Sequence, residues 1–361
     1  MNRKVMVRDV PVGGGSDVVI QSMCNVRSDD ERGILAQIGR LRDAGCRIVR
    51  LAVPDRKGLE VFGRVRQQTD MPLVADIHFD YKLAIGAIER GADKIRINPG
   101  NIGSPERVRA VVDAARSHHI PIRVGVNSGS VEKEILDKYG RVTAEALAES
   151  ALKNVRMIED MGFEDIVISM KSSDVQMNFD AHRIAASATD HPFHIGITEA
   201  GTMRRGKVKS AAGIGALLLS GIGDTLRVSL TADPVEEVIF ARELLEAVGL
   251  RKPKLDIVSC PTCGRTRIDL PALADEVERR LLSEEGIPEG LKIAVMGCVV
   301  NGPGEAREAD FGVCGGLGKG VIIARGEILE TVEEARLADA LIEAVRKQGR
   351  RGQAGPLTVG K

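Results

Sequence analysis

Short apolar runs alternate with longer stretches of helical periodicity along most of the chain. Eight runs are rich in β-forming residues, and each is followed by a segment in which apolar residues recur three or four positions apart. The runs occupy residues 18–22, 47–53, 72–77, 94–98, 122–126, 165–170, 193–197 and 225–230. Eight strands that alternate with helices predict a (β/α)8 TIM barrel, an α/β fold whose active site lies at the C-terminal ends of the strands.

A doubly wound open sheet is the alternative fold for the same alternation. It would place a GxGxxG motif after the first strand and gather polar residues at one switch point. No such motif follows residues 18–22, and polar residues stand at the end of nearly every run. Both observations favour the barrel.

Segments on either side of the eight runs predict further elements. Residues 1–15 alternate apolar and polar positions and end in three glycines, which predicts a hairpin on the barrel floor. Residues 251–254 read as a linker, after which a second α/β unit begins. That unit is expected to contain a helix, two strands and a final helix near residues 271–284, 292–296, 320–324 and 332–347. The predicted domains are 1–248 for the barrel, 249–349 for the second domain and 350–361 for a solvated tail.

Composition narrows the classes of partner. The 51 Lys and Arg balance the 51 Asp and Glu, so no net charge draws the protein toward nucleic acid or an anionic membrane. Aromatic residues make up 2%, which argues against a base-stacking surface. The chain opens without an apolar signal, and residues 213–223 are too short and glycine-rich to span a bilayer. We therefore expect a cytoplasmic protein with no nucleic-acid or membrane partner.

Three of the six cysteines form a pattern typical of metal binding. Cys260 and Cys263 form a CxxC turn, and Cys298 follows a later predicted strand. A reducing cytoplasm disfavours disulfides, but an iron–sulfur cluster, a zinc site and a redox-active thiol pair all remain open from spacing alone. Glu305, in a glycine-rich loop, and Cys314 are the two candidate fourth ligands. Cys314 could equally be a small buried strand residue.

Cationic and polar residues stand at the C-terminal ends of the predicted strands. Four arginines and a lysine would converge in one mouth, where they would repel one another unless they bind a polyanion. A diphosphate suits them because each guanidinium can contact two phosphate oxygens. The expected substrate-binding residues are Arg50, Arg96, Asn98, Arg123, Asn127, Lys171, Thr198, Arg227 and Ser229.

Three residues of the same mouth are candidates for proton transfer. Asp76 and His78 stand two positions apart at a strand end, so both side chains can face one side and share a proton. A purely structural histidine is an equal alternative. Glu199 is the third candidate, and its alternative role is to pair with an arginine. Cys24, at the end of the first strand, is expected to line the mouth without a catalytic role.

Taken together, these motifs resemble those of the 4-hydroxy-3-methylbut-2-enyl diphosphate synthases, the iron–sulfur enzymes of the methylerythritol phosphate route to isoprenoids. The resemblance runs through the whole chain. It includes VVIQSM, VRLAVP, ADIHF, KIRINPGNIG, RVGVNSGS, ISMKSS, GITEAG, RVSLT, SCPTCGR and GCVVNGPGEA, in that order. Two residues depart from the family pattern, because Cys24 replaces a usual Thr and Cys314 replaces a small residue without a thiol.

The resemblance implies a reaction, a cofactor and partners. The reaction is the reductive ring opening of 2-C-methyl-D-erythritol 2,4-cyclodiphosphate to 4-hydroxy-3-methylbut-2-enyl diphosphate. The cofactor is a [4Fe-4S] cluster in a domain like those of nitrite and sulfite reductases, with ligands Cys260, Cys263, Cys298 and Glu305. Ferredoxin or flavodoxin would deliver two electrons. Members of the family are homodimers, in which the cluster domain of one chain caps the barrel of the other.

Two other functions remain compatible with the residues alone. A zinc-stabilised barrel could act without redox chemistry on a phosphorylated or pterin-like substrate. An iron–sulfur electron carrier or regulator could use the barrel only as a scaffold.

Overall fold

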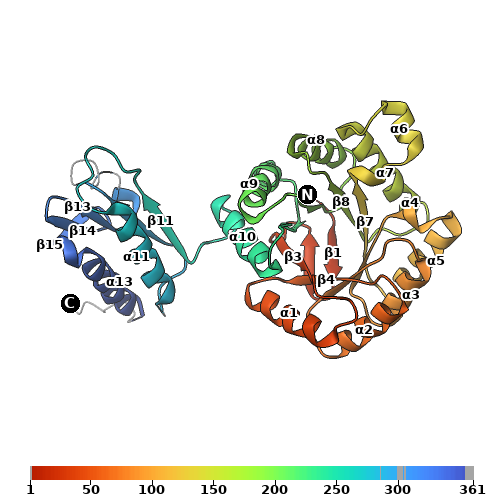
Figure 1. Ribbon diagram of the computed structural model, residues 1–361, viewed down its shortest axis with the longest axis horizontal. Coiled ribbons are helices and arrows are strands. Elements are labelled where there is room, and N and C mark those ends of the chain that lie inside the picture. The colour runs from red at the N-terminus through yellow and green to blue at the C-terminus, as the bar shows by residue number, and fades with distance from the viewer. Residues whose placement is uncertain (1, 285, 299–303, 305, 354–361) are drawn as a thin grey trace, which may run out of the picture. The chain divides into compact units, whose positions relative to one another are not determined.

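Eight parallel strands form a barrel in the N-terminal part of the chain (Figure 1). The computed structural model describes residues 2–284, 286–298, 304 and 306–353. The strands are β3 (Val19–Met23), β4 (Ile48–Ala52), β5 (Leu73–Asp76), β6 (Lys94–Ile97), β7 (Ile122–Asn127), β8 (Ile166–Lys171), β9 (His194–Ile195) and β10 (Thr225–Leu226). A bridge from Ile168 to Phe193 joins β8 to the β9 side of the sheet and closes the ring. The predicted (β/α)8 fold and its eight strands are confirmed.

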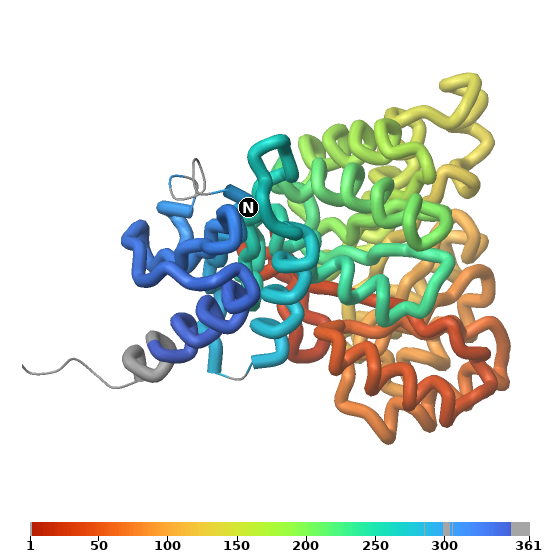
Figure 2. The backbone as a smooth tube through the Cα atoms, turned by 60° about the vertical axis from the view of Figure 1, so that its left-hand side comes forward, coloured from red at the N-terminus to blue at the C-terminus, as the bar shows by residue number. Residues whose placement is uncertain are grey.

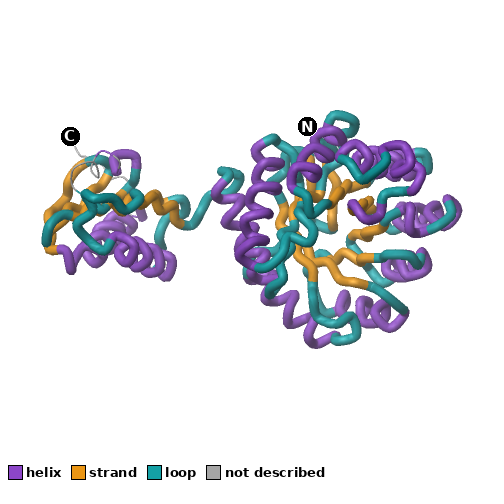
Figure 3. The backbone as a smooth tube through the Cα atoms, turned by 45° about the horizontal axis from the view of Figure 1, so that its top comes forward, coloured by secondary structure: helices purple, strands orange, loops and turns teal. Residues whose placement is uncertain are grey.

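Helices surround this ring of strands, and successive βα pairs follow the chain order around the barrel (Figures 2 and 3). The helices are α1 (Glu31–Asp43), α2 (Arg56–Gln67), α3 (Tyr81–Glu89), α4 (Pro99–Ile102), α5 (Pro105–Ser117), α6 (Lys133–Tyr139), α7 (Ala144–Glu159), α8 (Val175–Ala186), α9 (Met203–Leu219) and α10 (Pro234–Ala247). An aspartate begins five of them by accepting a hydrogen bond from a first-turn amide: Asp30, Asp55, Asp80, Asp174 and Asp233. These N-caps fix where each βα loop ends, which in turn fixes the loops that form the mouth.

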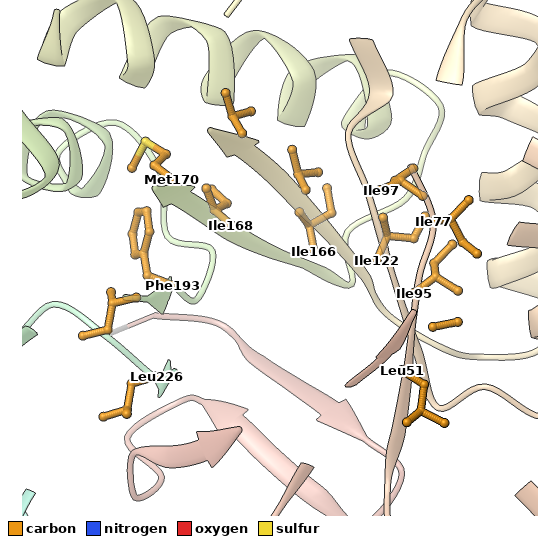
Figure 4. Packing of buried hydrophobic residues seen from close by; sticks show 14 of the residues in the cluster. Leu51, Ile77, Ile95, Ile97, Ile122, Ile166, Ile168, Met170, Phe193 and Leu226 are labelled. Atoms are coloured by element: carbon orange, nitrogen blue, oxygen red, sulfur yellow. The ribbon is translucent and has the colours of Figure 1, made fainter. Parts of the chain in front are cut away.

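The two faces of each strand serve different purposes. Ile95 and Ile97 on β6, like Ile166 and Ile168 on β8, belong to the main apolar core of the barrel (Figure 4). Because side chains alternate along a strand, the residues between these isoleucines face the barrel interior. Those residues are Arg96, which belongs to the polar mouth described below, and Val167, which belongs to an apolar cluster at the barrel floor.

An N-terminal hairpin packs against the apolar residues at the start of several strands. It consists of β1 (Lys4–Val7) and β2 (Val10–Gly13), which pair antiparallel. Its four valines, Val5, Val7, Val10 and Val12, form one cluster with Val19, Ile48, Val74 and Val167 of the barrel strands. Gly13 has a φ of 78°, and a Cβ there would lie 2.2 Å from the carbonyl oxygen of Arg3. The predicted floor hairpin is therefore present, and it needs a glycine at its end.

The second unit begins at Lys252, whereas the sequence placed this boundary after residue 248. Its sheet has the order β11 (Leu255–Ser259), β12 (Leu291–Met296), β13 (Phe311–Gly315), β14 (Lys319–Ala324) and β15 (Glu327–Glu333). Strands β11 to β13 are parallel, and β13 to β15 are antiparallel. The helices α11 (Leu270–Ser283) and α13 (Leu337–Gln353) share one apolar core with this sheet.

The final helix differs from its prediction at both ends. Residues 327–333 form β15, and α13 begins only at Leu337. Arg325 and Gly326 both have positive φ, which produces the tight turn that pairs β14 with β15. Residues 350–353, predicted as tail, continue α13, and the remaining tail lies outside the described residues. In the part of the chain that the structure describes, no helix combines the length and apolarity needed to cross a membrane.

Candidate functional site

The C-terminal ends of the barrel strands bring the predicted cations together. Parallel pairing aligns Asp76 with Arg96, and Arg96 with Arg123, on three consecutive strands. Arg50, on β4, precedes them in the sheet order. These four residues are at most 8% exposed, which makes them a buried ionic layer rather than surface salt bridges.

Asp76 is the centre of this layer. Its Oδ1 lies 3.3 Å from Arg96 Nη1, and its Oδ2 lies 3.7 Å from His78 Nε2 and 3.9 Å from Arg50 Nε. Burial alone would raise the pKa of Asp76, but Arg50, the hydrogen bond from His78 and Arg96 together hold that pKa well below its usual range. Asp76 is therefore a permanent carboxylate that orients the two arginines and His78.

A glycine provides the space that Arg96 occupies. Arg96 Nη2 donates a hydrogen bond to the carbonyl oxygen of Gly125, at 3.3 Å. A Cβ at Gly125 would lie 2.4 Å from Arg96 Nε, so any larger residue would displace the guanidinium. Sequence reasoning passed over Gly125, although an inward-facing glycine in a barrel strand is a signal of close approach.

Positive charge is in excess in the mouth. Burial lowers the pKa of Arg50 to about 10, with Arg227 and Arg96 adding to the effect and Asp76 opposing it. Burial and neighbouring arginines also lower the pKa values of Arg123 and Lys171 well below their usual range. Arg123 Nε and Nη1 are buried without a hydrogen-bond partner among the described residues. An anion would satisfy both the charge and the unused donors.

Arg227 has a carboxylate partner that the sequence reasoning missed. Arg227 Nε lies 3.5 Å from an oxygen of Glu237, which α10 presents from its first turn. The other oxygen of Glu237 accepts a hydrogen bond from the Leu230 amide at 2.8 Å. Burial raises the pKa of Glu237 despite the nearby charge of Arg227. The contact fixes the loop after β10, and with it the position of Arg227.

Ser130 joins two of the predicted substrate-binding residues. Its hydroxyl accepts hydrogen bonds from Asn98 Nδ2 at 3.2 Å and from the Asn127 amide at 3.0 Å, and donates to the Asn127 carbonyl at 3.0 Å. Asn98 Oδ1 in turn caps α4 by accepting from the Gly100 amide. Ser130 therefore links the Asn98 side chain, after β6, to the backbone of Asn127 at the end of β7.

The remaining mouth residues differ in exposure. Thr198 and Ser229 are half-buried, Lys171 is buried, and Glu199 is exposed. Glu199 has a φ of 50°, a left-handed conformation that is uncommon for this residue type and is often found at functional sites. No ion pair involves Glu199 among residues 2–284 and the later described segments, so its carboxylate stays available to a ligand.

Cys24 lies at the end of β3, and its side chain is buried. Burial, together with Cys46, raises the pKa of the Cys24 thiol to about 12. A protonated thiol is a poor nucleophile. Its environment agrees with the expectation that Cys24 has no catalytic role.

Two cysteines of the second unit lie at the same end of its sheet. Because β11 and β12 are parallel with Ser259 opposite Val295, Cys260 and Cys298 leave the sheet at the same end. The Gly297 amide donates to Cys260 Sγ at 3.3 Å, and the Arg267 amide donates to the Gly297 carbonyl at 3.2 Å. Amide-to-sulfur hydrogen bonds of this kind accompany cluster-binding thiolates.

Cys263 is exposed, and its surroundings favour the thiolate. Hydrogen bonds from the backbone and side chain of Arg265, and from Thr266, lower the pKa of Cys263. A thiolate is the form that binds iron or zinc. Three cysteines with these properties are a suitable donor set for a cluster, although no three His, Cys, Asp or Glu side chains of the described residues are close enough to bind one metal ion. The predicted ligand Glu305 lies outside the described residues.

Cys314 is more deeply buried than the other three cysteines of this unit, although Cys260 packs against the same apolar cluster. It lies on β13 opposite Met296 and is fully buried. Its apolar cluster includes Ala294, Ala306 and Ala309, on the side of the sheet away from α11 and α13. This is the environment of a small buried strand residue.

Comparison with known families identifies the chain. The family model described as the GcpE TIM-barrel domain matches residues 2–242. The chain belongs to the GcpE family. A second model, the GcpE protein C-terminal domain, matches residues 256–347, so both units of this GcpE protein have a family counterpart. The resemblance drawn from the sequence is confirmed.

Curated relatives of this GcpE protein are named 4-hydroxy-3-methylbut-2-en-1-yl diphosphate synthase (flavodoxin). The relative from Caldanaerobacter subterraneus is 53% identical over 96% of this chain and 97% of its own length. The relative from Geobacter sulfurreducens is 55% identical over the same shares. Among solved structures, a dihydropteroate synthase from Yersinia pestis covers 69% of this chain and 98% of its own with a TM-score of 0.50. At 12% identity, that likeness concerns the barrel fold alone.

Proposed function

We propose that this GcpE protein is a 4-hydroxy-3-methylbut-2-enyl diphosphate synthase. It takes 2-C-methyl-D-erythritol 2,4-cyclodiphosphate, opens the ring with two electrons and expels one oxygen as water. The observation that carries the proposal is the buried cationic mouth, in which several guanidinium donors, two of them on Arg123, lack hydrogen-bond partners among the described residues. The name shared by relatives more than 50% identical agrees with it.

The first task of the mouth is to bind and orient the diphosphate. Arg50, Arg96, Arg123 and Lys171 supply donors from four strands, while Arg227 and the polar residues Asn98, Asn127, Thr198 and Ser229 complete the ring of contacts. Guanidinium groups held by Asp76 and Glu237 keep a fixed orientation, so little reorganisation accompanies binding. Ring opening leaves more negative charge on the freed phosphate, and the cations stabilise that charge as it develops.

We assign proton transfer to Glu199, in the loop after β9, and to Asp76 and His78, at the end of β5. Asp76 remains a carboxylate, its Oδ2 lies 3.7 Å from His78 Nε2, and the exposed ring of His78 is open to solvent or substrate. Glu199 is exposed, so its carboxylate can take up a proton from solvent, approach an oxygen of the substrate and deliver that proton to release water. Asp76 and His78 thus set the orientation around that step.

We assign a [4Fe-4S] cluster to Cys260, Cys263 and Cys298, with Glu305 as the fourth ligand. The amide-to-sulfur bond at Cys260 and the lowered pKa of Cys263 support the assignment. The burial of Cys314 within the sheet supports Glu305 over Cys314 as the fourth ligand. When bound, the cluster supplies the single electrons that the ring opening requires.

The electron donor and the assembly follow from the same assignment. Flavodoxin is the proposed donor, since it appears in the names of the relatives, and ferredoxin is the alternative from the sequence. The proposed assembly is a homodimer in which the cluster domain of one chain caps the barrel of the other. It would unite two half-sites that belong to separate units of the chain. The protein is expected to act in the cytoplasm.

An anaerobic assay of arginine variants tests the proposal. Arg123→Met removes a buried donor of the mouth, whereas Arg109→Met removes an exposed arginine of α5 and serves as the matched control. With the cyclic diphosphate and reduced flavodoxin, we expect Arg123→Met to lose at least about 100-fold in kcat/KM, as removal of a charge-stabilising donor does. Equal activity of both variants would contradict a diphosphate site in the mouth.

A further inference from the structure

The barrel interior contains a second layer of polar side chains, between the valine floor and the mouth. We call it the inner tier. Its members face the interior from several strands and are at most 3% exposed: Gln21, Lys94, Ser169, His194 and Thr225. Barrels of this class usually fill that level with branched apolar side chains. A buried polar layer at this depth therefore needs a functional reason.

Lys94 is the most unusual member of the inner tier. Strand pairing places it opposite Val74, two residues before Arg96 and on the same side of β6. Its side chain is fully buried, and its Nζ has no hydrogen-bond partner in the described part of the barrel. Among the described residues, no carboxylate forms an ion pair with its ammonium group.

The charges around Lys94 are of its own sign. Burial, Arg123 and Arg50 lower its pKa well below the usual range. His194, on β9, lies in a similar environment, since burial and the charges of Arg123 and Lys171 lower its pKa. The carboxylate of Asp76 is already engaged with Arg96, and the carboxylate of Glu237 with Arg227. In the free enzyme, burial and these like charges therefore disfavour the ammonium form of Lys94.

An anion in the mouth reverses this balance. A diphosphate adds two or more negative charges next to Arg123 and Arg50, the two cations that oppose a charge on Lys94. In a low-dielectric interior, such charges act strongly over several ångströms. Protonation of Lys94 then becomes favourable, and the new ammonium group adds to the attraction for the anion.

We propose that Lys94 is a positioning residue for the diphosphate, neutral in the empty barrel and protonated from solvent when the anion fills the mouth. The inference rests on the proposed function for the identity of the anion. It has two consequences. Anion binding is accompanied by the uptake of one proton. Without the anion, the barrel interior does not contain a further unpaired positive charge on Lys94. Lys94 thereby couples the affinity of the mouth to pH.

Calorimetry of inorganic pyrophosphate binding tests this role. Titrations at one pH in two buffers with different ionisation enthalpies give the number of protons taken up. Lys94→Met preserves the length of the side chain but cannot be charged, and Lys4→Met, at an exposed position of the floor hairpin, is the control. The protonation of pyrophosphate itself is common to all proteins and cancels in the comparison.

We expect wild type and Lys4→Met to take up more protons than Lys94→Met, by up to one per site. Lys94→Met should bind pyrophosphate about tenfold more weakly, the size expected for loss of one nearby charge. Its thermal midpoint should be equal or higher, because methionine carries no desolvation cost, so weaker binding cannot be ascribed to unfolding. Proton uptake that is equal in Lys94→Met and wild type would overturn the proposal. Loss of uptake in His194→Asn but not in Lys94→Met would overturn it too.

If wild type binds pyrophosphate without taking up a proton, the role of Lys94 is wrong but the diphosphate site stands. If wild type does not bind pyrophosphate, both are wrong.

Discussion

Arg96 Nη1 lies 3.3 Å from Asp76 Oδ1 at the bottom of a mouth in which cations outnumber carboxylates among the described residues. This pair determines how the mouth is organised. Asp76 also attracts Arg50 and His78, so one buried carboxylate orients three groups. The consequences can be tested residue by residue.

Replacing Asp76 by Asn should damage both stability and activity. The change leaves Arg50 and Arg96 buried without their shared anion, and breaking a buried ion pair costs about 3–5 kcal/mol. We expect a lower thermal midpoint and a loss of more than about 100-fold in kcat/KM, since the arginines lose their orientation. Asp70→Asn, which breaks the exposed pair with Arg8, is the control and should be nearly silent. A stable, active Asp76→Asn protein would contradict the central role of this carboxylate.

Gly125→Ala should impair binding without removing any charge. The added methyl group would lie 2.4 Å from Arg96 Nε, so the guanidinium must move. Gly129→Ala, four residues later, is a matched control, because a Cβ there meets no atom within 4 Å. Steady-state kinetics should show KM raised about tenfold for Gly125→Ala only, as expected for a displaced bidentate contact. Similar KM values for both variants would show that Arg96 does not bind substrate in its present position.

Cys314→Ala should retain the iron and lose stability. Cys314 is packed in the sheet core, so loss of its sulfur costs about 1–2 kcal/mol without changing the ligand set. Cys263→Ser, by contrast, should lose most of the iron, because Cys263 is a proposed cluster ligand. Cys263 is exposed, so the change removes no buried packing. Iron content and chemical denaturation of anaerobically purified proteins measure both effects. Iron loss in Cys314→Ala comparable to that in Cys263→Ser would assign the fourth ligand to Cys314.

The stability of the barrel should fall in mild acid because of His182. Burial lowers the pKa of His182 to about 4, while the unfolded chain has its ordinary value of 6.5. The folded state therefore binds fewer protons between these values, so stability is complete above pH 6.5 and is lost as the pH falls toward 4. The total amounts to about 3 kcal/mol. Denaturation at several pH values should show this loss in wild type and a smaller one in His182→Gln; identical pH profiles would exclude His182 as the cause.

The sequence was most informative where local pattern decides structure. Eight runs with helical segments between them predicted the barrel, and the rule that strand ends form the mouth brought Arg50, Asp76, Arg96 and Arg123 together in advance. These residues could be predicted because a parallel barrel places every strand end on one side.

Contacts between distant segments could not be predicted in this way. Gly125 makes room for a side chain 29 residues earlier, and the hydroxyl of Ser130 reaches Asn98 in another loop. Residues 327–333 alternate as a strand yet border a helix, and only the positive φ of Arg325 and Gly326 returns the chain into the sheet. The burial of Lys94 could not be predicted either, because a lysine at the start of a strand is usually exposed.

One measurement tests the central claim most directly. The wild-type protein, purified anaerobically with its iron and sulfide quantified, is incubated with 2-C-methyl-D-erythritol 2,4-cyclodiphosphate and reduced flavodoxin, and the products are identified by mass spectrometry. We predict conversion to 4-hydroxy-3-methylbut-2-enyl diphosphate, with two electrons consumed per molecule and iron and sulfide present in equal amounts. A protein loaded with iron and sulfide that leaves the cyclic diphosphate unchanged, or an active protein that contains zinc alone, would contradict the account.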